Sequence, residues 1–353
     1  IAILAVVSCL EWPTLHHHHH NHHQTTTTTI MSLPTHSIKE EEEDIHENNT
    51  NKATILSSAL NLSNTIVGAG MLGLPGAFAG TGYLTGTILL FLSCYFSTQG
   101  LMLLSRSAVK ANVYPSSFYT VAHAAVPQYT ILIDAAVSLK CFGVATGYLI
   151  TVGDCMVEAF ALLLSTYEND DSTLHPMLVS RKTWVTFALL AVLPVSFFHQ
   201  FHKLKFASAT ALIFVFGLTA GIVAYAHHLL GDPCAGSQEE CRGIIESVTT
   251  VPTTISKLPI FIFAFTCQQN IFPVVNELQN RTMPRLDHTV AIATLFALAI
   301  FYIVSIEGYA TFGSNVKGDI LLNYPENKVV TVMRICIAFM LTLHYPLQLD
   351  PSR

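Results

Sequence analysis

Charged residues are scarce in this chain. Asp, Glu, Lys and Arg make up 11% of its 353 residues, whereas about a quarter of a soluble domain is charged. The chain also lacks a phosphate-binding loop, a nucleophile elbow and a Cys/His cluster at metal-ligand spacing, so we do not expect an enzyme. It has no basic patch with interleaved aromatic residues, and nucleic acid is therefore not an expected partner.

Apolar residues instead fill half of the sequence and are grouped into long blocks. They make up 51% of the chain, and its mean hydropathy is +0.48. A helix that crosses a hydrocarbon core of roughly 30 Å needs about 20 such residues. Eight blocks of about this length follow residue 52, at 54–79, 82–104, 129–164, 183–200, 206–230, 255–275, 288–312 and 329–349. The pattern predicts an all-α, polytopic helical bundle in a lipid bilayer.

The first 52 residues differ in composition from the rest. Histidines fill most of 16–23, and threonines fill 25–29. Such low-complexity sequence predicts a disordered tail over 1–52. The chain does not begin with Met and has one at Met31, so residues 1–30 are interpreted as upstream translated sequence or a fragment artefact rather than native protein. A metal-binding histidine tract is the alternative.

Basic residues are more frequent in the loops on the N-terminal side of the predicted bundle than on the opposite side. Because cytosolic loops are rich in Lys and Arg, this predicts a cytosolic N-terminus. The loop that contains Cys234 and Cys241 then lies on the other side, where a disulfide persists. The spacing alone leaves open whether these two cysteines form one.

The first apolar block contains an interruption. Residues 61–75 read Asn-Leu-Ser-Asn-Thr-Ile-Val-Gly-Ala-Gly-Met-Leu-Gly-Leu-Pro. Glycine and proline disfavour a continuous helix, and backbone groups freed inside a bilayer need partners. In transporters such breaks present half-helix ends to substrates and ions. Close helix packing through small residues is the alternative.

The sixth block contains a second interruption. Three consecutive amides, Gln268 to Asn270, follow Thr266 in an apolar stretch between Pro259 and Pro273. Buried amides are costly unless they are hydrogen-bonded, so they need partners. Interrupted first and sixth helices are what an inverted repeat of five helices produces. The two breaks therefore predict a leucine-transporter-type inverted repeat with broken helices 1 and 6.

At these two segments the chain resembles the amino acid/auxin permease family. Residues 61–75 are similar to the opening helix of that family, and Phe263–Leu278 resembles its sixth-helix signature. Further matches lie at Gly143–Asp154, Ser196–Ser208 and Gly308–Leu321. The family includes sodium-coupled neutral amino acid transporters and vacuolar amino acid transporters.

The resemblance covers residues 52–353 and carries several expectations. It implies an amino acid transporter domain over 53–353 that holds about 8 of 11 helices and is truncated after helix 8. The implied function is secondary active transport of amino acids across a plasma membrane or a vacuolar or lysosomal membrane, and neutral amino acids are the expected substrates. The coupling ion is Na+ or H+, with no other cofactor. An amino acid sensor with little flux is the alternative, and a metal-ion transporter is a further rival prompted by the histidine tract.

The two breaks are expected to form the substrate site. The substrate carboxylate would meet backbone N–H groups of the first break, and the amino group would meet oxygens of the sixth helix. The expected substrate-binding residues are Thr65, Gly68, Ala69, Gly70, Phe265, Thr266 and Gln268.

For the coupling ion, the resemblance implies Asn64 in the first helix and Thr342 in the eighth. Their oxygens suit a small hard cation, and bracing of the helix break is the alternative role for Asn64. Asp154 and Glu158 lie one helical turn apart and are candidates for a proton relay if H+ is the coupling ion.

Four further ionisable groups lie within apolar blocks. Lys140 is expected to extend to the cytosolic edge of the bilayer. Glu307 and Arg334 are expected to form a structural ion pair between the seventh and eighth helices, and His344 is expected to be a hydrogen-bonded core residue.

Overall fold

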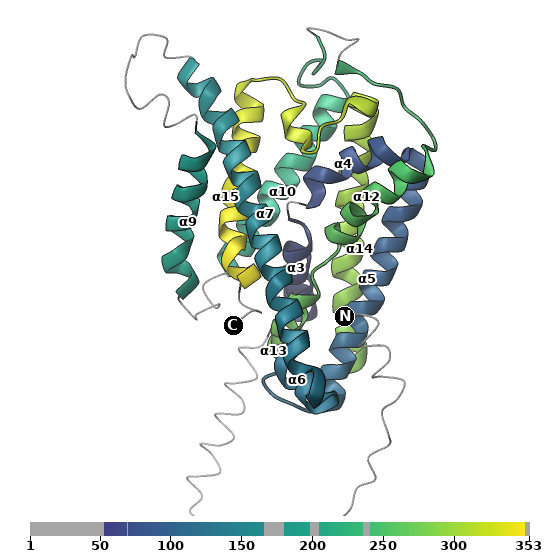
Figure 1. The fold of residues 1–353 in the computed structure, drawn as a ribbon, viewed down its shortest axis with the longest axis vertical. Helices are drawn as coiled ribbons and strands as arrows, with labels where there is room; N and C mark the ends of the chain where they lie inside the picture. The colour runs from purple at the N-terminus through teal and green to yellow at the C-terminus, as the bar shows by residue number, and fades with distance from the viewer. Residues whose placement is uncertain (1–52, 69, 166–179, 198–204, 236–240, 350–353) are drawn as a thin grey trace, which may run out of the picture.

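The computed structural model describes residues 53–68, 70–165, 180–197, 205–235 and 241–349. Helices dominate this part of the chain, which contains no β-strand beyond an isolated bridge between Ala53 and Leu278. The long helices run side by side along the long axis of the molecule (Figure 1). The predicted tail at 1–52 lies outside the described residues.

Each of the eight apolar blocks forms a helix or a pair of helices. The first block forms α3 (Ile55–Ile66) and α4 (Gly70–Thr81), and the sixth forms α12 (Val251–Ala264) and α13 (Ile271–Glu277). The other blocks form single helices, which are α5 (Tyr83–Ala111), α7 (Thr130–Ser165), α9 (Arg181–Phe197), α10 (Lys205–Ala226), α14 (Met283–Phe312) and α15 (Lys328–Leu349). A short helix, α6 (Phe118–Ala125), connects α5 to α7.

Five helical segments of the described chain are long and apolar enough to cross a membrane, and α3 with α4 make a sixth if they are one bent span. The apolar part of α10, Thr210–Ala226, is shorter. The expected all-α, polytopic membrane protein is therefore confirmed. The inverted repeat remains a prediction.

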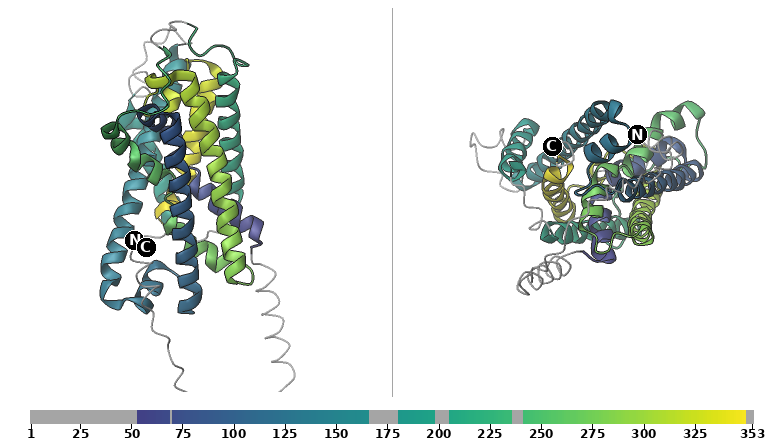
Figure 2. Two further views of the ribbon diagram at one scale, coloured as in Figure 1. Left: turned by 90° about the vertical axis from the view of Figure 1, so that its right-hand side faces the viewer. Right: turned by 90° about the horizontal axis from the view of Figure 1, so that it is seen from below.

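Different helices and connections lie at the two ends of the bundle. One end holds α6 and the start of α3, and the other holds residues 227–235 and 241–250 and the α14–α15 connection (Figure 1). We call these the α6 end and the Cys234 end. Figure 2 shows the bundle from the side, with its long helices nearly parallel, and from below.

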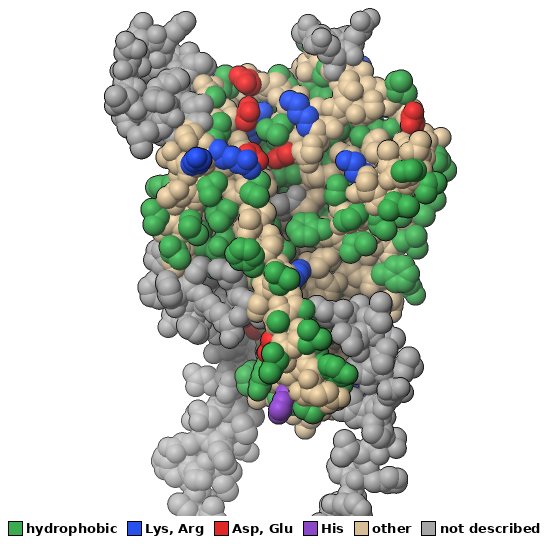
Figure 3. All heavy atoms as spheres, in the orientation of Figure 1, with side chains coloured by type: hydrophobic (Ala, Val, Ile, Leu, Met, Phe, Trp, Pro, Cys, Tyr) green, Lys and Arg blue, Asp and Glu red, His purple; other side chains and the backbone are tan. Residues whose placement is uncertain are grey.

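The surface of the bundle is apolar where lipid would contact it. Phe96, Phe142 and Ile213 are among many large apolar side chains that are exposed. On the face in Figure 3, hydrophobic side chains cover the middle, while most charged side chains lie toward the Cys234 end. A lipid bilayer solvates such a band, and water solvates the charged ends.

The helices pack in two groups. In the first, α14 contacts α3, α4, α5 and α10, and α12 packs against α4 and α5. In the second, α7 packs against α9 and α15. Because α14 contacts four other helices and its most apolar window is 56% buried, against 28% for α5, α14 is the central helix of the first group.

Candidate functional site at two helix breaks

The first break separates α3 from α4 and bends the chain by 57°. Helix α3 ends at Ile66, and the N–H of the next residue, Val67, donates to the carbonyl of Ser63 (2.8 Å). The N–H of Gly68 then donates to the carbonyl of Ile66 (3.0 Å), outside the helical pattern. The glycines at the break are the sequence reason for this end, since they favour non-helical backbone.

The second break separates α12 from α13. Helix α12 ends at Ala264, and residues 265–267 are not helical. A single turn of 3-10 helix, Gln268–Asn270, follows before α13 begins at Ile271. Both predicted interruptions are therefore present in the structure.

The two breaks lie against each other. A Cβ atom on Gly70, the first residue of α4, would stand 2.9 Å from the Cα of Ala264, the last residue of α12. Only glycine allows this approach, because real Cβ contacts of this length essentially never occur. The N-terminal end of α4, with its positive partial charge, thus meets the C-terminal end of α12, with its negative partial charge.

Three predicted residues of the first break are described, and one is not. The hydroxyl of Thr65 donates to the carbonyl of Leu62 (2.8 Å). The carbonyl of Gly68 accepts the N–H of Met71 (3.3 Å), and Gly70 starts α4. Ala69 lies outside the described residues.

The three predicted residues of the sixth helix all lie at its break. Phe265 is buried, and its carbonyl accepts the hydroxyl of Ser97 on α5 (2.6 Å). Gln268 donates from Nε2 to the same hydroxyl oxygen (3.0 Å). The Thr266 hydroxyl donates back to the carbonyl of Ile262 (2.6 Å). Ser97 is therefore a further residue of the site, which the sequence did not single out.

A chain of polar side chains connects the sixth-helix break to the first break. The ammonium of Lys140 donates to the carbonyl of Thr266 (3.2 Å) and to Oε1 of Gln269. Gln269 Nε2 donates to Oε1 of Gln348 on α15 (2.6 Å), and Gln348 Nε2 donates to the Tyr148 hydroxyl (3.1 Å). We call Lys140, Gln269, Gln348 and Tyr148 the Lys140 chain.

The Lys140 chain ends at the first break. A Cβ on Gly68 would lie 2.8 Å from the Tyr148 hydroxyl oxygen, so the end of the chain touches the backbone there. The ammonium of Lys140 was expected at the cytosolic edge and instead lies at the sixth-helix break, because freed backbone oxygen is available to it there. Its charge was visible in the sequence, but Gln348 and Tyr148 belong to long apolar helices with no pattern that marks them as its partners.

The residues suggested for a coupling ion occupy different surroundings. Asn64 is fully buried, and its Oδ1 lies 3.1 Å from Nε2 of His344. The Thr342 hydroxyl donates to the carbonyl of Ala338 within α15 (2.7 Å). No contact between Asn64 and Thr342 is recorded in the described part of the chain. His344 is the hydrogen-bonded core histidine that was expected.

Arginines engage both carboxylates suggested for a proton relay. Arg181 Nε lies 2.9 Å from Oδ1 of Asp154, and Arg334 Nη1 lies 3.6 Å from Oε2 of Glu158. The buried Arg334 also donates from Nη2 to the carbonyl of Leu321 (3.0 Å). The expected pair of Glu307 with Arg334 is therefore wrong, since α15 turns Arg334 toward α7. The carboxylate of Glu307 instead lies 3.6 Å from Nε2 of His227.

A third carboxylate lies near this charged group, in the connection between α14 and α15. Asp319 is partly buried, and its Oδ1 accepts the N–H of Leu321 (2.9 Å). Burial raises the pKa of Asp319 from 3.8 to about 6, because desolvation disfavours the ionised form, and the nearby Asp154 acts in the same direction.

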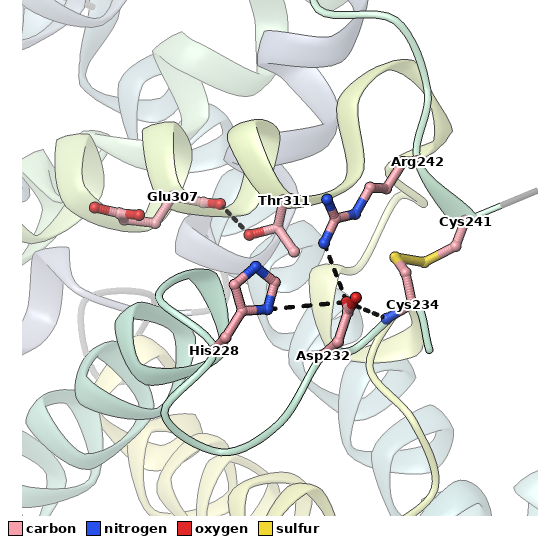
Figure 4. A network of polar contacts seen from close by, with 7 residues as sticks. All are labelled: His228, Asp232, Cys234, Cys241, Arg242, Glu307 and Thr311. Carbon is pink, nitrogen blue, oxygen red and sulfur yellow. Dashed lines mark hydrogen bonds and ion pairs between the residues drawn. A yellow bond between two sulfur atoms is a disulfide. The ribbon is translucent and has the colours of Figure 1, made fainter. Parts of the chain in front are cut away.

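The loop at the Cys234 end holds the two cysteines together (Figure 4). Cys234 and Cys241 form a disulfide, with their Cα atoms 5.5 Å apart. Oδ1 of Asp232 accepts the N–H of Cys234 (2.9 Å) and Nη2 of Arg242 (3.1 Å). The backbone hydrogen bond from Cys234 is the main reason that the pKa of Asp232 lies below its usual value. This network fixes the loop beside the end of α14.

The fold and the site define a class of protein: a polytopic helical membrane protein with a polar site between two broken helices. Residues 51–353 match the family model described as "Transmembrane amino acid transporter protein". The chain belongs to this family. The resemblance to amino acid/auxin permeases is thereby confirmed, and the matched family is one of transporters, not of enzymes.

The chain is also similar to curated members of the family. Vacuolar amino acid transporter 5 of Schizosaccharomyces pombe is 36% identical over 316 residues, which are 88% of this chain and 70% of that protein. Vacuolar amino acid transporter 7 of Saccharomyces cerevisiae is 30% identical over 315 residues, 85% of this chain and 58% of that protein. Sodium-coupled neutral amino acid transporter 7 of Homo sapiens is 27% identical over 289 residues, 80% of this chain and 60% of that protein.

Proposed function

We propose that this chain belongs to a secondary active transporter of amino acids, with neutral amino acids as its substrates and Na+ or H+ as its coupling ion. One observation carries the proposal. A Cβ atom on Gly70, the first residue of α4, would stand 2.9 Å from the Cα of Ala264, the last residue of α12. The positive N-terminal end of α4 and the negative C-terminal end of α12 thus lie side by side. An amino acid zwitterion has a carboxylate for the first end and an ammonium for the second.

The substrate would be oriented by the polarity of these ends. Its carboxylate would accept N–H groups around Gly68, Ala69 and Gly70, at the positive N-terminal end of α4, and the N–H of Gly68 would leave the carbonyl of Ile66 to do so. Its amino group would donate to oxygens of Thr65, Thr266 and Gln268. The buried ring of Phe265, which packs edge-on against Phe301 with centroids 5.1 Å apart, would supply an apolar wall.

Two arrangements are available for the coupling ion. For Na+, the oxygens of Asn64 and Thr342 would be ligands, and both now take part in other hydrogen bonds. For H+, Asp154 and Glu158 would carry the proton, and protonation would weaken their ion pairs with Arg181 and Arg334. Each arrangement predicts a different driving gradient.

The membrane is proposed from the relatives. The fungal relatives are vacuolar amino acid transporters by name, which favours a vacuolar or lysosomal membrane for this chain. The plasma membrane remains the second candidate.

Uptake into proteoliposomes tests the proposal. The purified protein is reconstituted, a mixture of radiolabelled amino acids is supplied, and Na+ and pH gradients are imposed separately. We expect gradient-driven uptake of neutral amino acids. Loss of Na+-driven uptake in Asn64→Ala would support the Na+ site. Binding of an amino acid without uptake under either gradient would refute transport and identify a sensor.

A further inference from the structure

Lys140 brings a positive charge to the centre of the polar site. It lies ten residues after the start of α7 at Thr130, inside the apolar segment Pro127–Leu163. Ionisable residues within membrane-spanning helices are costly and are functional candidates by default. Within the described residues, no carboxylate forms an ion pair with Lys140, so neutralisation by an acid does not explain its presence.

The acceptors of the ammonium are those of a cation site. Thr266 follows the end of α12, and the break leaves its carbonyl free to accept Lys140 (3.2 Å). Oε1 of Gln269 is the second acceptor. The C-terminal end of a helix favours a positive charge, and broken helices of transporters coordinate Na+ or H+ through such carbonyls. Lys140 thus places a tethered cation where a free cation would otherwise bind.

We propose that Lys140, in place of Asp154 and Glu158, is the proton-carrying group that couples transport to a pH gradient, which makes a free coupling cation unnecessary. This inference rests on the proposed function. In the cycle, the proton leaves Nζ for water on one side of the membrane and leaves a neutral amine. A proton from water on the opposite side then restores the ammonium. Lysine can make this exchange in an apolar environment, whereas arginine stays charged.

The Lys140 chain connects the protonation state of Lys140 to the hydrogen bonds at both helix breaks. A neutral amine lacks the charge that strengthens the hydrogen bonds to Thr266 and Gln269, so its hold on both weakens and the amide of Gln269 is freer to turn. Gln269 holds Gln348, which in turn holds the Tyr148 hydroxyl against Gly68. One protonation state of Lys140 therefore fixes both breaks together, and the other loosens them.

The groups around Lys140 are thiols and amides, so Lys140 is the group among them that would exchange a proton. Cys141 follows Lys140 on α7 and Cys267 follows Thr266 at the break, so each places a thiol near the ammonium. From α15 and the 3-10 turn, Gln348 and Gln269 contribute amides, which do not titrate.

The other ionisable groups of the packed helices are engaged elsewhere. His344 on α15 bonds to Asn64, and Arg181 on α9 pairs with Asp154 toward the Cys234 end. On α6, His123 stacks on the ring of Tyr119 (5.7 Å). On α7 itself, Asp134 precedes Lys140 by six residues, which places it on a different face of the helix.

The test compares net accumulation with exchange in proteoliposomes, using an equimolar mixture of radiolabelled neutral amino acids. Lys140→Met is always neutral and Lys140→Arg is always charged. Lys110→Met, which removes an exposed lysine at the end of α5, is the matched control. Accumulation is measured with a pH gradient and no Na+. Exchange is measured at equal pH on both sides, over a range of pH.

A gradient of one pH unit supports about tenfold accumulation when one proton accompanies each substrate. We expect wild-type protein and Lys110→Met to reach this level. Both Lys140 variants are expected to lose accumulation to a much greater extent than exchange, and the exchange that remains should no longer depend on pH.

Three results would overturn the inference. Undiminished accumulation in Lys140→Met, or in Lys140→Arg if Lys140→Met does not fold, would show that another group carries the proton. Equal loss of exchange and accumulation in both variants, with lower thermal stability in detergent, would show that Lys140 only braces the break. Wild-type uptake that needs Na+ and ignores pH would remove Lys140 from coupling but leave the proposed function intact. Absence of uptake and exchange in wild type would refute the proposed function itself.

Discussion

Both helix breaks interrupt a helix inside the bundle, but different interactions stabilise the two interruptions. At the first break, side chains are removed: glycine lets the backbone at Gly70 approach Ala264, and at Gly68 it approaches Tyr148. At the sixth break, side chains are added: the amides of Gln268 and Gln269 bond to Ser97, Lys140 and Gln348. Steric fit therefore specifies the first break, and hydrogen bonding specifies the sixth.

This difference predicts different responses to mutation. A break specified by close packing is sensitive to one methyl group, because interiors are close-packed. A break specified by hydrogen bonds is sensitive to the loss of a partner, because the remaining buried group is left unsatisfied. The predictions below test this contrast, beginning with the largest expected effect.

Gln269→Leu is expected to be the most destabilising change. It removes one of the two acceptors of Lys140 and leaves Oε1 of the buried Gln348 without its donor, and a buried group left unsatisfied costs about 1–3 kcal/mol. Thermal unfolding in detergent measures the loss. Gln268→Leu is the control, because its one recorded partner is Ser97 and its effect should be clearly smaller. Equal losses in the two variants would mean that the Lys140 chain does not stabilise the sixth break.

Gly70→Ala is expected to disrupt the first break. The new methyl group would stand 2.9 Å from the backbone of Ala264, and overpacking of this kind costs about 1–3 kcal/mol. Uptake should fall with stability, since the two half-helix ends are pushed apart. Gly147→Ala is the matched control, because no atom lies within 4 Å of the added carbon. A variant of Gly70 with normal stability and uptake would show that the approach of the two breaks is not required.

Asp319 is expected to give stability a pH dependence that neither break produces. Its pKa is raised from 3.8 to about 6 in the folded protein, so the folded state binds the proton more tightly than the unfolded chain. Stability is therefore greatest below about pH 4 and declines as pH rises through about 6. The partial exposure of Asp319 limits the change to on the order of 1 kcal/mol.

Unfolding temperatures measured from pH 4 to pH 7 check this prediction. In Asp319→Asn the decline should disappear, because an amide still accepts the N–H of Leu321 but does not titrate. Asp232→Asn is a useful comparison at the same end of the bundle, since the pKa of Asp232 is shifted in the opposite direction. An unchanged pH profile in Asp319→Asn would assign the dependence to another group.

Thr342→Val is expected to have the smallest effect on stability. The Thr342 hydroxyl bonds only within its own helix in the described structure, to Ala338, and such a bond contributes about 0.5–1.5 kcal/mol at most. Uptake driven by a pH gradient should be unchanged in this variant. Loss of Na+-driven uptake with normal stability would instead place Thr342 at a cation site, together with Asn64.

The sequence alone was enough to predict the helices and the positions of both breaks. Each of the eight apolar blocks contains a helix or a broken pair. Block length and hydropathy are local properties of the sequence, and the thickness of the bilayer core determines the helix length they must match. The breaks at Gly68–Gly70 and at Phe265–Asn270 also follow from local chemistry, since glycine weakens a helix and consecutive amides need partners.

Only the tertiary structure decided which side chains meet. Arg334 turns to Glu158 and not to Glu307, Asn64 faces His344, and Lys140 reaches Thr266, 126 residues away along the chain. These pairings depend on how each helix is rotated about its axis and on which helices become neighbours. Hydropathy is nearly uniform around helices that lipid surrounds, so the sequence pattern carries little information about that rotation, and packing of the whole bundle fixes it.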